Sequence, residues 1–399
     1  MGVLSKADIA RVGTDPVPTE PYWSEDYFAQ EREHVFRRVW LYAGREVNLP
    51  KPGDFIVKDI PACHASVLIT RADDGQLRAF HNVCSHRSAK VVWEPKGHAS
   101  RFVCKYHGWG YGLKGDLRNV PDEPNFFGLD RSKCGLTPVA LDTSNGFIFL
   151  NLDPNPRQTL KEFLHGIDAR LDQHAFGEWT EYYEVQADIP VNWKCIIDNF
   201  QETYHLSFVH SISVGDRSVG PGNPLGHPLG FELFGPHRMM GIWGNLDHKP
   251  AAVESFAIQN GGVISQGATD FAKRDASRHP NWQMDVHGIF PNVLIDVTPS
   301  FFLTHEVMPL TASLTRWTTA VYFPPAKTAG QRISQEYSVA AYRDTAAEDL
   351  AVLRTQQESM LSGAKRAFHF QANEVLCRHL GASVDQYVRN KGPGAAAAA

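Results

Sequence analysis

Two short segments place cysteine and histidine at spacings that suit metal binding. The first reads CSHR at residues 84–87, and the second reads CKYHGW at residues 104–109. Together they give Cys-x-His, an interval of 17 residues, and then Cys-x-x-His. Each segment falls on a turn between β-rich runs, so two hairpin tips could each present two ligands to one site. The candidate ligands are Cys84, His86, Cys104 and His107.

Two thiolates and two imidazoles can hold a tetrahedral zinc ion, or a [2Fe–2S] cluster whose second iron is bound by histidines. A zinc finger usually places its two cysteines together and its two histidines together. Here each turn carries one residue of each type, which favours a cluster with cysteines on one iron and histidines on the other. A structural zinc site is the alternative. The remaining cysteines lack partners at ligand spacing and are interpreted as small buried hydrophobes: Cys63, Cys134, Cys195 and Cys377.

The two motifs resemble the Rieske signature of the ring-hydroxylating oxygenases. Arg87 follows the first motif and Gly108–Trp109 closes the second, as in that signature. The resemblance implies a Rieske [2Fe–2S] cluster on these four ligands. Ala89 and Tyr106 stand where the respiratory-chain Rieske proteins carry further, disulfide-forming cysteines. Their absence resembles the oxygenase branch, which works at lower potential.

A second candidate site lies in DNFQETYHLSFVH, residues 198–210. Asp198, Glu202 and His205 are spaced i, i+4 and i+7, so a helix over 193–209 would place them on one stripe. A polar stripe on an otherwise apolar helix is costly to bury unless its members bind something. His210 follows His205 by five residues, roughly 140° further around a regular helix. We therefore expect His210 on a distorted turn or beyond the helix end.

Two histidines and one carboxylate form the facial triad of non-haem iron(II) oxygenases, which leaves positions open for O2. The carboxylate is expected from a helix over residues 333–362. On that helix Asp349 shares a face with apolar residues such as Leu353, whereas Glu348 lies on a more polar face that we expect to be solvated. A carboxylate on a buried face needs a cation or hydrogen-bond donors. Asp349 is therefore the predicted third ligand, beside His205 and His210.

The family resemblance covers residues 22–385 and includes both of these helices. In the family, a late helical aspartate completes the triad. Glu202 stands where most members have an aspartate that connects the two metal centres across a subunit boundary, so the resemblance implies that Glu202 hydrogen-bonds His205 and passes electrons towards the iron. Asp198 is the other catalytic candidate. A glutamate in this place resembles members that oxidise quaternary amines such as carnitine and betaines.

The elements that must position these residues fall into two predicted domains. Residues 1–40 are a lead-in whose helix, over 24–40, is expected to pack with the catalytic domain. Residues 41–155 hold short β-rich runs typical of an antiparallel sheet, the predicted Rieske domain. Residues 156–388 mix strands and helices, which indicates an α+β catalytic domain with a long helix across an antiparallel sheet. The resemblance implies a helix-grip fold of the START type there, and residues 389–399 are a low-complexity tail.

Composition excludes several other classes. The 399 residues are 43% hydrophobic and 21% charged, with a net charge of -5, and no basic tract favours nucleic acid. No apolar run approaches the roughly 20 residues that span a bilayer, so we expect a cytoplasmic protein. The glycines of GPGNPLG, residues 220–226, lack the strand context of a nucleotide-binding loop. Electrons are therefore expected from a partner reductase, with or without a ferredoxin.

The expected activity is that of a terminal oxygenase component, which uses O2 to hydroxylate or dihydroxylate an aromatic or other hydrophobic substrate, as in aromatic hydrocarbon catabolism. The alternative is a monooxygenase that removes a methyl group from, or cleaves a C–N bond of, a quaternary or methylated amine. An electron carrier and a zinc-stabilised ligand-binding protein are the rival classes. The resemblance implies a homotrimer, with an added small β-subunit as the other assembly. The substrate-pocket candidates are Phe200, Phe208, Ile212, Trp243, Phe290, Val293 and Phe301.

Overall fold

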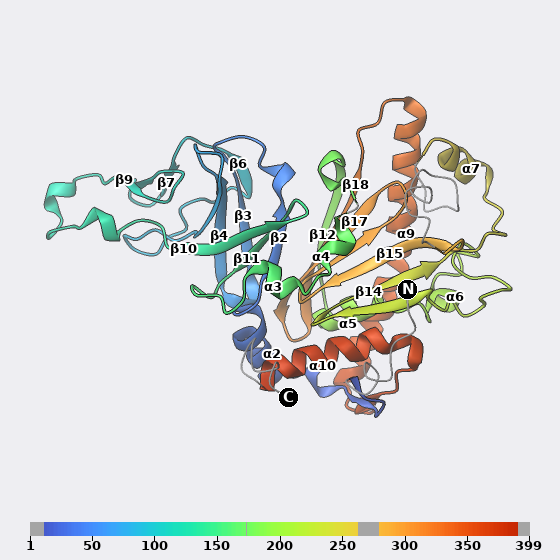
Figure 1. Ribbon diagram of the computed structural model, residues 1–399. Coiled ribbons are helices and arrows are strands. Elements are labelled where there is room, and N and C mark those ends of the chain that lie inside the picture. Colours follow the sequence, from blue (N-terminus) through green and yellow to red (C-terminus); the bar gives the residue numbers. More distant parts are fainter. Residues whose placement is uncertain (1–11, 173, 262–278, 390–399) are drawn as a thin grey trace. The chain divides into compact units, whose positions relative to one another are not determined.

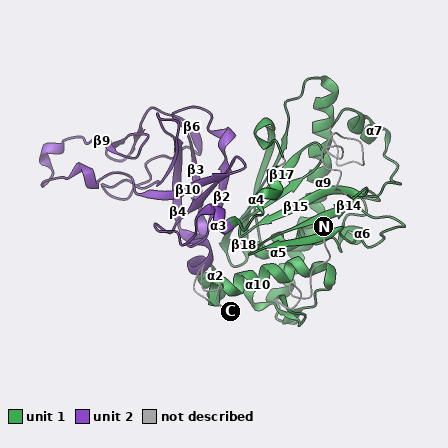
Figure 2. Cartoon of the chain, viewed as in Figure 1, with its two compact units in different colours: residues 1–31, 164–389 green, residues 32–163, 390–399 purple. Residues whose placement is uncertain are grey.

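The computed structural model describes residues 12–172, 174–261 and 279–389 (Figure 1). The described residues form two compact units (Figure 2). Residues 32–163 form the smaller unit, which contains both Cys/His motifs. The larger unit combines the chain up to Glu31 with everything from Leu164 to Arg389, and it contains the second candidate site. The low-complexity tail from residue 390 onward lies outside the described residues.

An antiparallel seven-stranded sheet, in the order β2-β11-β10-β5-β4-β3-β6, is the frame of the smaller unit. Four of its strands, β3, β4, β5 and β11, coincide with the predicted β-rich runs DFIVKDI, SVLITR, QLRAFHNV and GFIFLNL, whereas β2, β6 and β10 were not predicted. The sequence of β10 is PVALDTS, and its proline and aspartate are both disfavoured in strands. The strands are β2 (Leu41–Arg45), β3 (Asp54–Ile60), β4 (Ala65–Arg71), β5 (Leu77–His81), β6 (Lys96–His98), β10 (Pro138–Ser144) and β11 (Phe147–Asn151).

A small three-stranded sheet accompanies it, made of β7 (Phe102–Val103), β8 (Gly110–Tyr111) and β9 (Leu117–Asn119). Side chains from both sheets form one buried hydrophobic cluster, and this cluster includes Cys84 and Cys104. The two Cys/His turns are therefore anchored in a common core rather than carried on independent loops.

A second antiparallel seven-stranded sheet is the centre of the larger unit, in the order β12-β18-β17-β16-β15-β14-β13. The run GIFPNVLIDV, residues 288–297, is predicted from its apolar residues to form one strand; this is wrong, because the chain turns there between β15 and β16. Pro291 has no N–H to offer a strand ladder, which explains the interruption. The strands are β12 (Glu181–Ile189), β13 (Gly230–Phe234), β14 (His237–Trp243), β15 (Trp282–Ile289), β16 (Val293–Val297), β17 (Phe302–Thr311) and β18 (Leu314–Phe323).

The predicted long helix is α9 (Ala329–Leu361), and it packs across this sheet (Figure 1). Thr328 begins it with a capping box, because its hydroxyl accepts from the backbone of Gln331 while the Gln331 side chain returns to the cap. Val339 and Tyr342 pack on buried strand residues that include Phe301 and Leu303. This packing holds the middle of α9, where Asp349 lies, against the sheet.

Four further helices among the described residues include three short ones and the 15-residue α10. They are α3 (Leu160–Leu164), α4 (Asp168–Leu171), α7 (Ala252–Gln259) and α10 (Val375–Arg389), and the strand pair β1 (Val17–Pro18) and β19 (Ala367–Phe368) lies apart from both large sheets. None of the described helices is both long enough and apolar enough to cross a membrane.

The single helix predicted over 193–209 is wrong. The chain forms α5 (Trp193–Asn199), a break, and then α6 (Leu206–Val209). Glu202 lies in the break, and its carboxylate accepts from the backbone N–H groups of Tyr204 and His205. Such local side-chain bonds compete with helical hydrogen bonds and explain why the helix does not continue.

The predicted N-terminal helix begins as expected and ends earlier. Ser24 accepts a hydrogen bond from the Tyr27 backbone at 3.2 Å, and α2 (Glu25–Glu31) then passes into a π-helical turn over Arg32–Phe36. Glu31 is fully buried and binds the ammonium of Lys194 at 2.5 Å and the indole N–H of Trp193 at 2.9 Å. A buried ion pair thus joins α2 to α5.

Replacing Lys194 with methionine should lower the free energy of unfolding by about 3–5 kcal/mol, because it leaves the Glu31 carboxylate buried without its cation. Thermal or urea unfolding measures the change. The double variant Glu31→Gln/Lys194→Met should recover most of the loss. Arg354→Met, which breaks an exposed ion pair with Glu358 on α9, is the control and should cost at most about 1 kcal/mol. Equal losses of stability in Lys194→Met and Arg354→Met would contradict the prediction.

Candidate metal centres

The two Cys/His turns of the smaller unit have the same backbone geometry. The Ser88 N–H donates to the Cys84 carbonyl, and the Gly108 N–H donates to the Cys104 carbonyl, both at 2.9 Å. The last residue of each turn has a positive φ, 57° at Ser88 and 72° at Gly108. Glycine adopts this conformation readily, whereas serine does so only where the surrounding structure enforces it. Each turn therefore presents its Cys and His side chains in a fixed direction.

The four predicted ligands separate into a sulfur pair and a nitrogen pair. Cys84 and Cys104 are buried, whereas His86 is half-buried and His107 is exposed. The Nδ1 atoms of His86 and His107 face each other at 3.1 Å. The His86 ring stacks on buried Trp109, with a centroid distance of 5.2 Å and an angle of 8° between the planes. The imidazole rings are therefore held with both Nδ1 atoms at one place, as two ligands of a single iron would be.

This separation distinguishes the two metal assignments left open by the sequence. Ligands of one tetrahedral zinc ion lie roughly 3.3–3.8 Å apart. Among the described residues, the one group of three potential ligands whose atoms all lie within 4.8 Å is His205, His210 and Asp349. The Cys84, His86, Cys104 and His107 set forms no such group, so its spread fits a two-iron cluster, with sulfur on one iron and nitrogen on the other, better than a single ion.

Tyr111 was not predicted, and its hydroxyl lies against the cluster ligands. Its oxygen is 3.2 Å from Cys84 Sγ and accepts a hydrogen bond from the Ser85 N–H at 3.0 Å. With the Ser85 bond supplying a donor to the oxygen, the Tyr111 O–H is free to donate to the sulfur. Burial, followed by its contact with Cys84, raises the pKa of Tyr111 well above its usual value, so the hydroxyl keeps its proton. The one indication of this role in the sequence is that Tyr111 lies two residues after Trp109, which closes the second Cys/His motif.

Tyr111→Phe should lower the reduction potential of the cluster by tens of millivolts, because hydrogen bonds to the sulfurs stabilise the reduced, more negative state. Spectroelectrochemical titration of the visible Rieske bands measures this change. Tyr182→Phe, at an exposed position of β12 in the larger unit, is the matched control. An unchanged potential in Tyr111→Phe would show that the hydroxyl does not donate to Cys84.

In the larger unit, the ends of α6 and the middle of α9 bring together the three residues predicted to hold the second metal. His205 precedes α6 and His210 follows it, as expected for a histidine beyond the helix end. Asp349 Oδ1 lies 2.9 Å from His210 Nε2 and 3.7 Å from His205 Nε2. The three ligand atoms thus converge on one point from separate elements.

The chemistry of this group fits a metal ion. Asp349 is almost fully buried, and its Oδ1 forms no hydrogen bond with any described residue, although two imidazole nitrogens lie close to it. A buried carboxylate oxygen without a donor is costly. A divalent cation bound between Oδ1 and the two Nε2 atoms would satisfy all three, in the two-histidine, one-carboxylate arrangement of non-haem iron(II).

Each histidine of this group is oriented by a second carboxylate. Glu202 contacts His205 Nδ1, and Glu348 contacts His210 Nδ1 at 2.8 Å and Ser213 Oγ at 2.5 Å. The expectation that Glu348 is solvated is therefore wrong. Partial burial raises its pKa, but the hydrogen bonds from Ser213 and His210 outweigh that effect and lower the pKa overall. Carboxylates on both Nδ1 atoms leave both Nε2 atoms free to bind metal.

Asp198 does not belong to this group. Because α5 ends at Asn199, Asp198 does not continue a stripe with Glu202, and the Tyr22 hydroxyl donates to it at 2.8 Å instead. Burial raises the pKa of Asp198 to about 7, against the lowering effects of the Tyr22 hydrogen bond and the Arg238 charge. Asp198, the other catalytic candidate, thus forms a buried contact between the N-terminal segment and α5 and lies outside the three-ligand group, and its catalytic role stays a prediction.

A cavity of about 980 Å³, including its open mouth, lies beside His205, His210 and Asp349. Phe200 and Phe301 line it, as predicted. Five other pocket candidates do not: Phe208 and Ile212 are exposed by 68% and 89%, Phe290 stacks on Tyr387, and Trp243 and Val293 lie elsewhere on the sheet. The break after Asn199 explains part of this difference, because it changes which way the residues near α6 point.

Polar residues that were not predicted also line the cavity. Asn199, the last residue of α5, has a buried Nδ2 without a hydrogen-bond partner among the described residues. Asp296 lies on β16, in the run VLIDV. The sequence did contain an indication of this position, because a carboxylate within an otherwise apolar strand is seldom buried unless it binds a partner.

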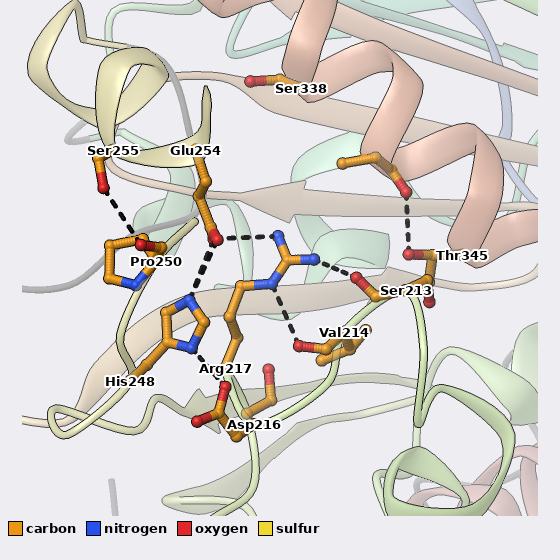
Figure 3. A network of polar contacts seen from close by, with 12 residues as sticks. Ser213, Val214, Asp216, Arg217, His248, Pro250, Glu254, Ser255, Ser338 and Thr345 are labelled. Carbon is orange, nitrogen blue, oxygen red and sulfur yellow. Dashed lines mark hydrogen bonds and ion pairs between the residues drawn. The ribbon is translucent and has the colours of Figure 1, made fainter. Parts of the chain in front are cut away.

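Arg217 lines the same cavity and is already engaged (Figure 3). Its guanidinium donates to the carbonyls of Ser213 and Val214 and lies 3.6 Å from Glu254. Glu254 in turn contacts His248 at 3.2 Å, and His248 contacts Asp216. This network neutralises the arginine and fixes the loop that follows His210.

Two family profiles match the chain over these sites. One is described as the ring hydroxylating alpha subunit (catalytic domain) and matches residues 176–390, and the other is the Rieske [2Fe-2S] domain and matches residues 39–138. The chain therefore belongs to the ring-hydroxylating oxygenase alpha subunits, in which a Rieske domain precedes the catalytic domain. The two matched domains imply a Rieske cluster and a mononuclear iron that works with O2.

Individual relatives include both amine and arene oxygenases. The carnitine monooxygenase oxygenase subunit of Escherichia coli (strain K12) is 26% identical over 364 residues, which cover 88% of this chain and 85% of that protein. The naphthalene 1,2-dioxygenase large oxygenase component of Pseudomonas aeruginosa is 34% identical over 197 residues, 48% of this chain and less than half, 43%, of that relative.

A solved structure extends the likeness to the whole fold. The crystal structure of a quaternary ammonium Rieske monooxygenase in complex with L-carnitine has a TM-score of 0.75 to this chain at 21% identity. The superposition covers 97% of this chain and 99% of that one. The antiparallel sheets and long helix described above are therefore a shared architecture.

Proposed function

We propose that this chain is a terminal oxygenase component that oxidises a small organic molecule at an iron(II) held by His205, His210 and Asp349. The observation that carries the proposal is the convergence of these three ligand atoms beside a largely apolar cavity. When bound, the cluster supplies electrons and the iron supplies open positions at which O2 is activated.

The chain's own residues have three tasks in this scheme. Glu202 and Glu348 fix the tautomers of the ligand histidines by accepting from Nδ1, so that Nε2 stays available. Apolar walls contributed by residues such as Leu206, Ile242 and Leu303 exclude water and position the substrate. Glu202, half-buried beside His205, has the further task of coupling proton movement to electron delivery.

The substrate is proposed to be hydrophobic over most of its surface. Aromatic rings of Phe200, Phe301 and Tyr342 face the cavity together with the apolar walls, which suits an arene, and the naphthalene 1,2-dioxygenase component is among the relatives. A methylated amine is the second candidate. Glutamate at position 202, the match to a carnitine monooxygenase subunit over most of both chains, and the same aromatic faces favour it.

Several properties accompany the proposal. Electrons come from a partner reductase, directly or through a ferredoxin, and the active form is a homotrimer in which the cluster of one subunit serves the iron of another. The proposed boundaries are residues 1–40 for the lead-in, 41–155 for the Rieske domain, 156–388 for the catalytic domain and 389–399 for the tail. A cytoplasmic location is consistent with dependence on a reduced nicotinamide pool.

The test is anaerobic reconstitution of both metal sites, followed by aerobic assay with a generic reductase and two sets of substrates. Hydroxylated arene products would place the enzyme with the dioxygenases, and formaldehyde release from N-methylamines would place it with the amine monooxygenases. A colourless protein that binds zinc, holds no acid-labile sulfide and consumes no O2 with either set would overturn the proposal.

A further inference from the structure

The cavity wall carries a buried carboxylate that the metal site does not use. Asp296 lies on β16, is 4% exposed and lines the cavity. Its Oδ1 is buried and has no hydrogen-bond partner among the described residues. Buried polar atoms nearly always have such a partner, so this oxygen is available to a group of a molecule bound in the cavity.

A chain of buried hydrogen bonds holds Asp296 in place. Its other oxygen, Oδ2, lies 3.1 Å from His305 Nε2, and His305 Nδ1 lies 3.2 Å from the Tyr342 hydroxyl and 3.3 Å from Thr319 Oγ1. The His305 ring stacks on Phe200 at 4.2 Å and on Trp317 at 5.8 Å. With Oδ2 committed to His305, Oδ1 is the oxygen left for the contents of the cavity.

Among the described residues, the ion-pair partner of Asp296 is His305, which is charged only if protonated, and no lysine or arginine pairs with this carboxylate. Arg217 is the one lysine or arginine among the described residues that line the cavity, and Ser213, Val214 and Glu254 already occupy its guanidinium (Figure 3). A buried carboxylate is stabilised most by a partner that brings both a proton donor and a positive charge. A neutral arene brings neither of these.

We propose that Asp296 recognises a protonated amine, with Oδ1 accepting the ammonium N–H of an N-methylated substrate. This inference rests on the proposed function and narrows its substrate class. The N-methyl groups would pack on the nearby faces of Phe200 and Tyr342, which also line the cavity. A quaternary ammonium has the charge but no N–H, so it leaves Oδ1 without a hydrogen bond and should bind less tightly than a tertiary amine.

Calorimetric binding to the anaerobic holoenzyme at pH 7 tests this with three probes of matched shape. They are N,N-dimethylbenzylamine, which is protonated, its neutral isostere isobutylbenzene, and benzyltrimethylammonium. The protonated amine should bind at least about tenfold more tightly than either of the others, the ratio expected for one hydrogen bond to a charged group. Equal binding of isobutylbenzene, or of benzyltrimethylammonium, would overturn the proposal, and this comparison needs no variant.

Variants then assign the effect to the residue. Asp296→Asn should weaken the protonated amine at least about tenfold and leave isobutylbenzene unchanged. Asp188→Asn, the same substitution at an ion-paired carboxylate on β12 outside the cavity, should change neither. Retained amine affinity in Asp296→Asn would overturn the assignment. Because binding is measured without turnover, retained amine affinity in Asp296→Asn would leave the oxygenase proposal untouched. Failure of the oxygenase proposal would instead appear as missing metals or missing O2 consumption.

Discussion

Asp349→Ala is expected to remove the mononuclear iron and abolish turnover while the Rieske visible spectrum persists. Asp349 contributes the one carboxylate oxygen of the three-atom group, and the two remaining imidazoles would bind iron(II) too weakly to retain it. Iron content should fall from about three to about two atoms per chain, since the cluster holds two and the triad one. Metal analysis with the visible spectrum measures both sites in one sample.

Asp344→Ala is the matched control for this variant. Asp344 lies on the same helix, and its side chain is exposed and paired with its neighbour Arg343. It should leave the iron content and turnover unchanged. If Asp349→Ala lost the cluster as well as the mononuclear iron, Asp349 would be a residue that maintains the fold rather than a metal ligand.

Glu202→Gln is expected to retain both metal sites and to lose more than about 100-fold in turnover. Removing a group that only orients a ligand histidine costs about 10–100-fold in metal affinity or activity. Glu202 is proposed to have the additional task of coupling proton movement to electron delivery, which glutamine cannot perform. Reoxidation of the pre-reduced cluster with substrate and O2 present, followed by stopped-flow absorbance, isolates the affected step.

Glu348→Gln separates the two roles of these glutamates. Glu348 bonds His210 Nδ1 much as Glu202 contacts His205 Nδ1, but Glu348 comes from α9 and also accepts from Ser213. If orientation alone matters, the two glutamine variants should be impaired alike. Slow cluster reoxidation in Glu202→Gln, with nearly normal reoxidation in Glu348→Gln, is the expected result, and equal rates would remove Glu202 from electron delivery.

The sequence was most informative where chemistry depends on short-range spacing. The Cys-x-His and Cys-x-x-His turns predict the cluster ligands, because each pair is presented by a single turn and no distant contact is needed. Strands such as β3, β4 and β18 were predicted for a similar reason, since their apolar patterns are local and uninterrupted.

The sequence was least informative where a side chain's role depends on distant contacts. Asp198 and Glu202 have the spacing of one helical stripe, and only the break after Asn199, stabilised by the Glu202 carboxylate, separates them. Glu348 has a polar pattern on α9, and its pairing with His210 depends on a loop more than a hundred residues away. Most predictions of pocket residues were wrong for the same reason. An apolar side chain in a core strand and one on a cavity wall have identical local sequence patterns.

One rigid element links substrate to metal. The helix α9 carries Asp349 and Glu348 on the iron side, and Ser338, Ala341 and Tyr342 on the cavity wall, within a single 33-residue span. A molecule bound in the cavity therefore contacts the same helix, α9, that carries Asp349, the proposed iron ligand. A shift or rotation of α9 would move Asp349 relative to His205 and His210, so substrate binding is expected to alter the proposed iron site.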